Sequence, residues 1–304
     1  MKDFFYRTLI SLTRFTGTWL FGIVSWFIAT GYFLFSTRRV KDSLYFYGAL
    51  FPKRSHLYLL SCTWRQFHRF THVFLDRLLP QQEEKHPFIV HEDAHLIDTV
   101  QRKEGAILLM SHLGHWELTA HMFFKIYKDD YPDMKLLLYL GRKHREQIES
   151  RQKQDIAARG IEMISIAENE AAPMDLVKGI QFLRKGGLVS MTGDRRWRND
   201  QRFLSVRFLH HKARIPEAPF VLALLSGAPI FTFFTHRAGP YQHILRIFPP
   251  LYVRAPSRKD RQQALHCAAQ LYADRLEEMV RQAPFEWFHF EPFIEREGEF
   301  QVSK

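Results

Sequence analysis

Residues 111–117 read Ser-His-Leu-Gly-His-Trp-Glu and hold an imidazole and a carboxylate that could together do acid–base chemistry. They directly follow a short apolar run, residues 106–110 (Ala-Ile-Leu-Leu-Met), which begins after Gly105. A run this short and continuous is typical of a strand buried on both faces. The pattern therefore places His112 at the carboxyl end of a strand, where α/β sheets carry their chemistry.

Glu117 lies five residues beyond His112, and a continuous helix would hold the two side chains roughly 140° apart around its axis. They can meet only if the chain turns between them, which Gly114 permits. A carboxylate hydrogen-bonded to one imidazole nitrogen fixes the tautomer and makes the other nitrogen a general base. We therefore predict His112 as the catalytic base and Glu117 as its partner, with the substrate's own hydroxyl as nucleophile. If the hydroxyl attacks a carbonyl, the oxyanion that forms needs hydrogen-bond donors, and backbone amides near Gly114 or a basic side chain are the candidates.

The alternative interpretation is that His112 and Glu117 are polar residues of a surface loop and a helix start, because a pair at this spacing often occurs by chance.

Two clusters of basic residues also follow predicted strands. Residues 142–145 (Arg-Lys-His-Arg) come after a strand ending at Leu140, and residues 194–198 (Asp-Arg-Arg-Trp-Arg) come after one ending at Thr192. Arginine side chains bind phosphate through two parallel hydrogen bonds. Arginines that converge beside a candidate base predict a phosphorylated or otherwise anionic substrate. The alternative is a solvated basic face.

The other motifs give little support for a metal, nucleotide or serine-hydrolase site. Residues 91–95 (His-Glu-Asp-Ala-His) match the zinc-protease pattern H-E-x-x-H, but His91 directly follows a predicted strand and no third ligand is evident, so we predict polar residues that open a helix. The sequence has no P-loop, G-x-G-x-x-G or G-x-S-x-G pattern, which leaves nucleotide binding and serine-hydrolase chemistry without support. Cys62 and Cys267 have neither metal-ligand nor redox spacing. We expect no bound metal or cofactor, and a reducing compartment.

The composition is both basic and apolar. The 304 residues carry a formal net charge of +11, with 46% hydrophobic and 15% aromatic residues. This combination favours an anionic membrane surface as partner over nucleic acid. A nucleic-acid surface would interleave aromatic with basic residues, and only Trp197 in the two clusters does so. We therefore predict no nucleic-acid partner.

Residues 15–37 carry no charge and lie between Arg14 and the pair Arg38-Arg39. As a helix they would extend roughly 34 Å, enough for a hydrocarbon core of about 30 Å. We predict a membrane anchor, with a buried core helix or a re-entrant segment as alternatives. More basic residues follow the segment than precede it, which favours a cytoplasmic body.

The remaining chain alternates between strand-like and helical patterns. An amphipathic helical stretch covers about residues 42–80 and could either lie on a bilayer or cap the core. Beyond it, apolar runs predict strands near residues 88–90, 106–110, 135–140, 163–166, 188–192, 230–235 and 244–248, with helices near 92–102, 116–127, 143–158, 173–185 and 258–282. This βαβ alternation predicts an α/β fold with a mostly parallel or mixed sheet flanked by helices. We expect an N-terminal anchor over residues 1–40 and one catalytic domain over 41–304.

The order of these features resembles the lauroyl/myristoyl acyltransferase family of lipid A biosynthesis, within the lysophospholipid acyltransferase superfamily that the pattern His-x4-Asp/Glu marks. The likeness covers nearly the whole chain. Besides the apolar N-terminal segment it includes residues 111–117, 139–145, 183–189, 193–195, 206–209, 222–229 and 283–288.

The resemblance implies transfer of a fatty acyl group from acyl carrier protein, or from a coenzyme A thioester, to a hydroxyl of an anionic membrane glycolipid. The transfer would take place on the cytoplasmic face of a bacterial inner membrane. By match to the motifs, His112 would be the base and Glu117 its partner, and Arg142, Asp194, Arg195 and Arg196 would line the substrate site. The alternatives are an acyltransferase acting on a lysophospholipid or other polar lipid, and a non-catalytic basic protein that binds membranes.

Overall fold

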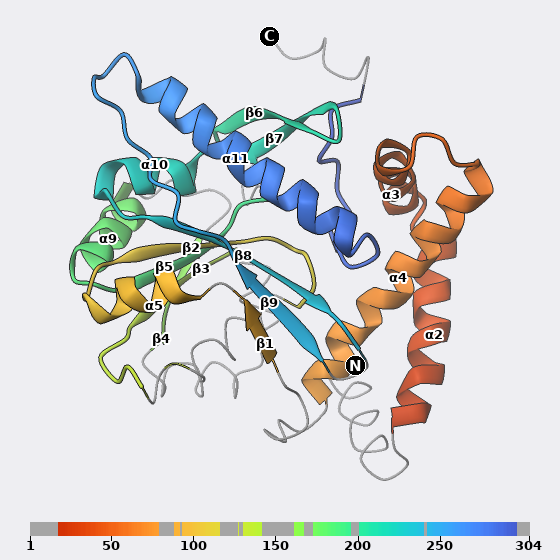
Figure 1. Ribbon diagram of the computed structural model, residues 1–304. Helices are drawn as coiled ribbons and strands as arrows, with labels where there is room; N and C mark the ends of the chain where they lie inside the picture. The colour runs from red at the N-terminus through yellow and green to blue at the C-terminus, as the bar shows by residue number, and fades with distance from the viewer. Residues whose placement is uncertain are drawn as a thin grey trace.

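The computed structural model describes residues 18–78, 88–91, 93–115, 127, 130–141, 161–166, 173–195, 201–239 and 242–296. Within them, a seven-stranded sheet has the order β1-β9-β8-β2-β5-β3-β4 (Figure 1). Its strands are β1 (Phe88–His91), β2 (Ala106–Met110), β3 (Leu136–Gly141), β4 (Ile161–Ile166), β5 (Leu188–Thr192), β8 (Ile230–Arg237) and β9 (His243–Ile247). Neighbours are parallel except for the antiparallel pair β8 and β9. The predicted α/β fold with a mostly parallel, mixed sheet is confirmed.

Strand β2 lies in the middle of the sheet, and all five of its residues are buried, as predicted. Its side chains alternate between the two faces. Ile107 and Leu109 join a core with α9 (Pro173–Arg184), α10 (Ala218–Ser226) and α11 (Arg261–Gln282), whereas Leu108 and Met110 pack on the other side with α5 (Ala94–Gln101). Figure 1 shows α10 and α11 above the sheet and α5 below it. Since apolar layers cover both faces, polar chemistry is left to the strand ends.

A two-stranded hairpin, β6 (Phe203–Phe208) and β7 (His211–Pro216), packs beside α11. Its turn holds Leu209 and His210, which both have a positive φ (50° and 66°). The backbone N–H of Leu209 donates to the Glu277 carboxylate of α11 (2.6 Å). The sequence patterns did not predict these two strands.

Within the described residues, three helices precede the sheet: α2 (Thr18–Phe35), α3 (Thr37–Leu50) and α4 (His56–Leu78). The predicted helical stretch over residues 42–80 is therefore two helices. Phe51 ends α3 at φ −127° and ψ 62°, because a residue that precedes a proline, here Pro52, is disfavoured in the helical region. Helix α4 buries Cys62, Gln66 and Phe67, so it caps the core.

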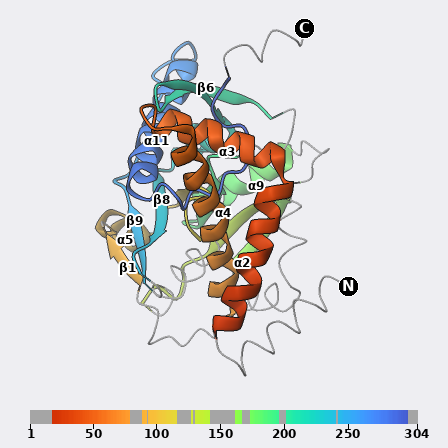
Figure 2. The same ribbon diagram turned by 90° about the vertical axis from the view of Figure 1, so that its right-hand side faces the viewer.

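Helix α2 corresponds to most of the predicted anchor and lies alongside α4 (Figures 1 and 2), where Phe21 packs against Phe74 and Leu75. Among the described helices, none alone is both long and apolar enough to cross a membrane, and α2 with α3 passes that test only as a pair bent by 88°. The membrane-anchoring role of residues 1–40, and the division at residue 40, stay predictions.

Candidate active site

Two neighbouring strands bring His112 and Asp194 together. Strands β2 and β5 are parallel, with Met110 paired to Thr192, and each of the two polar residues lies two positions beyond this pair. The backbone N–H of Gly193 donates to the Met110 carbonyl (2.8 Å), which continues the ladder past the strand ends. The sheet register therefore places the imidazole and the carboxylate side by side.

The Asp194 carboxylate accepts three hydrogen bonds from described residues. The His112 ring Nδ1 lies 2.8 Å from Oδ1, while the His112 backbone N–H (2.7 Å) and the Trp287 indole Nε1–H (2.9 Å) both donate to Oδ2. The side chains of His112 and Asp194 are only 6% and 0% exposed. In this geometry Nδ1 carries the proton toward the carboxylate, so the neutral ring has its lone pair on Nε2.

Electrostatics keep Asp194 ionised. Burial alone would raise the pKa of Asp194, but the His112 imidazole, through its charge when protonated and its hydrogen bonds, holds this pKa well below the usual range. An ionised carboxylate at Nδ1 stabilises the imidazolium that forms when Nε2 takes up a proton. His112 and Asp194, called the dyad from here on, are thus arranged for general-base chemistry.

A segment near the C-terminus, residues 286–289, runs antiparallel to the turn at residues 112–114. The backbone N–H of Phe288 donates to the His112 carbonyl, and that of Gly114 donates to the Glu286 carbonyl, both at 2.8 Å. The predicted turn at Gly114 is confirmed by its φ of +63°, and a Cβ there would lie 2.2 Å from the Thr235 carbonyl oxygen. Only glycine fits this position without strain.

These bonds bear on the candidate oxyanion donors. The Gly114 N–H is committed to Glu286, and the Leu113 N–H donates to Ser111 Oγ (3.1 Å). The amides of Gly114 and Leu113 are thus occupied within the protein. Oxyanion donation by another amide near Gly114, or by a basic side chain, stays a prediction.

Asp194, predicted to line the substrate site, is buried. Its carboxylate accepts hydrogen bonds from His112 and Trp287, an arrangement that can orient the His112 ring. Its contact with substrate stays a prediction. The neighbouring Arg195 donates from Nη2 to the Phe288 carbonyl (3.5 Å), and its Nε lies 3.8 Å from a Glu291 carboxylate oxygen. Arg195 thus lies next to the dyad, and its contact with substrate stays a prediction.

The other predicted site residues, Glu117, Arg142 and Arg196, lie outside the described residues. Their roles as ring partner and substrate ligands stay predictions. Among the described residues, the carboxylate that bonds the His112 ring is that of Asp194, at Nδ1.

The H-E-x-x-H match is split between two elements. His91 is the last residue of β1, and His95 lies in α5, which begins at Ala94. Zinc proteases need both imidazoles on one face of a single helix, and these two residues do not share a helix. Among the described residues, no group of three or more His, Cys, Asp or Glu side chains could hold a metal ion.

A model of the bacterial lipid A biosynthesis acyltransferase family matches residues 60–293, which is more than half of the chain and contains the whole dyad. The chain belongs to this family. The resemblance inferred from the sequence is confirmed, and membership supports an acyltransferase that uses an acyl donor and a lipid acceptor. A comparison with curated proteins found no match.

Two residues that contact Asp194 were not identified from the sequence. Trp287 donates to Asp194 Oδ2, and His289 Nε2 lies 2.9 Å from the Asp194 backbone carbonyl. Burial lowers the pKa of His289 to about 4, so its ring is neutral at physiological pH. Trp287 belongs to the 283–288 stretch that carried part of the resemblance, but nothing in its spacing links it to residue 194.

Proposed function

We propose that this protein moves a fatty acyl group from an acyl-thioester to a hydroxyl of a lipid A-type glycolipid precursor. The observation that carries the proposal is the dyad: a buried imidazole held by an ionised carboxylate at the carboxyl edge of the sheet, in a chain of this family. A base of this kind suits a reaction whose nucleophile is a substrate hydroxyl, because the hydroxyl must lose a proton as it attacks.

In the proposed reaction, His112 Nε2 takes the acceptor hydroxyl proton while that oxygen attacks the thioester carbonyl carbon. Asp194 stabilises the imidazolium through Nδ1. When the tetrahedral intermediate collapses, the carbon–sulfur bond breaks and the imidazolium returns its proton to the departing thiolate. The products are an ester and a free thiol, and no acyl-enzyme forms.

For the substrates, we propose acyl carrier protein or coenzyme A as the carrier of the acyl group, with no resident cofactor. The acceptor is anionic, which the net charge of +11 favours. Arg142, Arg195 and Arg196 are the proposed ligands of its charged groups, since guanidinium forks match phosphate. Glu117 is proposed as a second acid beside His112.

We further propose that the protein works on the cytoplasmic face of a bacterial inner membrane. Helix α2 exposes a set of large apolar side chains, namely Trp19, Ile23, Trp26, Phe27, Ile28, Tyr32, Leu34 and Phe35. Exposed cationic residues follow at Arg38, Arg39 and Lys41. Apolar side chains next to cations are the combination that binds anionic lipid surfaces.

The double substitution Phe27→Glu and Phe35→Glu is expected to weaken binding to vesicles of anionic phospholipid by at least about 10-fold, because it replaces two large apolar contacts by charges. These side chains are 66% and 86% exposed, so folding should be unaffected. Co-sedimentation with vesicles measures the effect. Leu225→Glu on α10, which is 44% exposed, is the matched control. Equal binding by both variants would refute the assignment of α2.

The function itself is tested with purified protein, labelled acyl-thioester and separate acceptors. We expect an acyl ester on the glycolipid precursor in preference to lysophospholipid. Transfer to lysophospholipid alone would replace the proposed acceptor, and failure to transfer to any lipid hydroxyl would overturn the proposal.

A further inference from the structure

The Asp194 carboxylate needs more than His112 to stay in place. Its Oδ1 bonds the ring Nδ1, and its Oδ2 accepts both the His112 backbone N–H and the Trp287 indole N–H. Two of the three donors belong to His112 itself. Trp287 is therefore, among the described residues, the donor that ties the carboxylate to another part of the protein.

Trp287 is buried and contacts residues from several parts of the chain. It is 1% exposed, and its ring makes edge-to-face contacts with Phe46 and with Phe293, with ring centroids 5.0 Å away in both cases. The Trp287 carbonyl accepts a hydrogen bond from the buried Gln66 amide of α4 (2.6 Å), and its backbone bridges to Leu113. The indole N–H thus comes from a rigid support.

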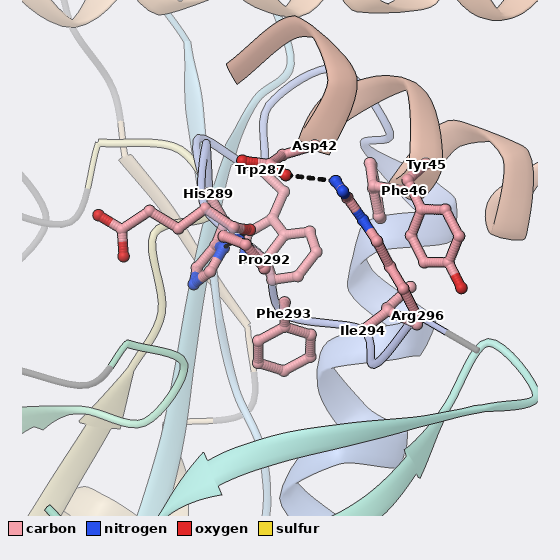
Figure 3. Close-up of a pocket in the computed structure, with 10 residues that line it drawn as sticks. Asp42, Tyr45, Phe46, Trp287, His289, Pro292, Phe293, Ile294 and Arg296 are labelled. Carbon is pink, nitrogen blue, oxygen red and sulfur yellow. Dashed lines mark hydrogen bonds and ion pairs between the residues drawn. The ribbon is translucent and has the colours of Figure 1, made fainter. Parts of the chain in front are cut away.

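His289 adds to this support. Its ring stacks on Trp287 at a centroid distance of 5.0 Å and an interplanar angle of 27°. It also bonds the Asp194 backbone carbonyl through Nε2, so the main chain and the side chain of Asp194 are held by the same short segment. Figure 3 shows Trp287, His289 and Phe293 close together in the lining of a small cavity, to which the ion-paired Asp42 and Arg296 also belong.

We propose that Trp287 is a positioning residue of this acyltransferase: its indole N–H fixes the rotation and the charge distribution of the Asp194 carboxylate, and through it the orientation and basicity of His112. The inference rests on the proposed function for its kinetic consequences, but the hydrogen bond it invokes acts in the free protein as well.

The chemistry of the bond gives the direction of the effect. A donor at Oδ2 withdraws negative charge from Oδ1, which moderates how strongly the carboxylate stabilises the imidazolium. Without the indole N–H, His112 should keep its proton to higher pH and be a less available base near neutrality.

The other titratable groups near the dyad should not obscure this effect. Burial lowers the pKa of His289 to about 4 and raises the pKa of Tyr272, on α11, well above its usual value. Arg195 contributes a charge that does not change with pH. Glu286, Glu291 and the buried His115 also lie near the dyad. The readout is therefore the ring signal of His112 itself, identified by its absence from His112→Ala.

The test is Trp287→Phe, which keeps an aromatic ring and removes the donor. We expect kcat to fall about 10- to 100-fold, the factor that one hydrogen bond to a charged group corresponds to, with the KM for the acyl donor within about twofold. The acidic limb of the kcat profile should move to higher pH by about half a unit. Phe293→Leu disturbs the same aromatic cluster without touching the carboxylate, and is expected to leave kcat within about threefold and the pH profile unchanged.

A loss of kcat in Phe293→Leu equal to that in Trp287→Phe, with no pH shift in either, would make Trp287 a packing residue and overturn the proposal. If Trp287→Phe fails to fold, Trp287→3-benzothienylalanine takes its place, because it keeps the bicyclic shape and lacks only the N–H. The same expectations apply to it.

A readout without substrate separates this proposal from the proposed function. Nitrogen-15 NMR of the labelled histidines, assigned with His112→Ala, follows the titration of His112 in the free protein. An upward shift of the His112 titration in the Trp287 variant supports the positioning role even if the wild type transfers no acyl group. Absence of transfer by the wild type would contradict the proposed function only. An unchanged titration overturns the positioning role while leaving the function intact.

Discussion

Replacement of His112 by alanine is expected to lower kcat for acyl transfer by about 10²- to 10⁴-fold, the contribution that a positioned general base makes. The KM for the acyl donor should change little, because the imidazole acts on the acceptor hydroxyl. Labelled acyl-thioester and glycolipid acceptor, with the ester quantified by mass spectrometry, give both constants. Wild-type turnover in His112→Ala would remove the mechanism.

Folding of His112→Ala must be checked, since His112 is buried and its backbone bonds both Asp194 and Phe288. The backbone bonds survive the substitution, so the circular dichroism spectrum should be unchanged. Glu117→Gln, measured in parallel, tests the acid predicted from the His-x4-Glu spacing. A large loss of kcat supports its place beside the base, and unchanged kcat would leave Asp194 as the acid that matters.

Asp194→Asn is expected to lower kcat by a similar factor, about 10²- to 10⁴-fold. The carboxamide has one acceptor oxygen and one NH₂ donor. The oxygen satisfies the Trp287 and His112 N–H groups at Oδ2, so the NH₂ faces Nδ1 and forces the ring proton onto Nε2. A ring protonated at Nε2 cannot accept the hydroxyl proton, which is how the same change disables serine proteases.

The pH dependence of unfolding provides a check on Asp194→Asn. Because the pKa of Asp194 is held low in the folded protein, its contribution to stability is present above about pH 4 and is lost as the pH falls further. The melting temperature of the variant should therefore fall less steeply in acid than that of the wild type. Wild-type kcat in Asp194→Asn would show that the carboxylate does not orient His112.

The sequence predicts the sheet well because strand signals depend on local residues. The apolar run at residues 106–110 has the length and flanks of a buried central strand, and the structure places β2 there with every residue buried. The β6–β7 hairpin was not predicted because its turn lacks the usual local signal. Two-residue hairpin turns favour Asn-Gly or Asp-Gly, whereas this turn has Leu209 and His210 in the left-handed region. That conformation is stabilised by a contact with α11, which no local pattern encodes.

The pairing of His112 with Asp194 could not be predicted from the local sequence. The sequence identifies His112 at a strand end and pairs it with Glu117, the nearest acid of the recognised motif. The structure pairs it with Asp194, because strand order puts β5 beside β2 and register aligns Met110 with Thr192. Strand order and register are properties of the assembled sheet. No local pattern links Trp287 to Asp194. The two residues are 93 positions apart in the sequence, and they meet because the chain after α11 returns to the turn at residues 112–114.

The most direct test of acyl transfer through His112 is the mass of the membrane lipids in a strain that lacks this gene. The glycolipid should lack one fatty acyl chain, and expression of the wild-type protein should restore the mass, whereas an equal amount of His112→Ala should not. Restoration by His112→Ala, or a lipid profile that does not change on deletion, would contradict the account.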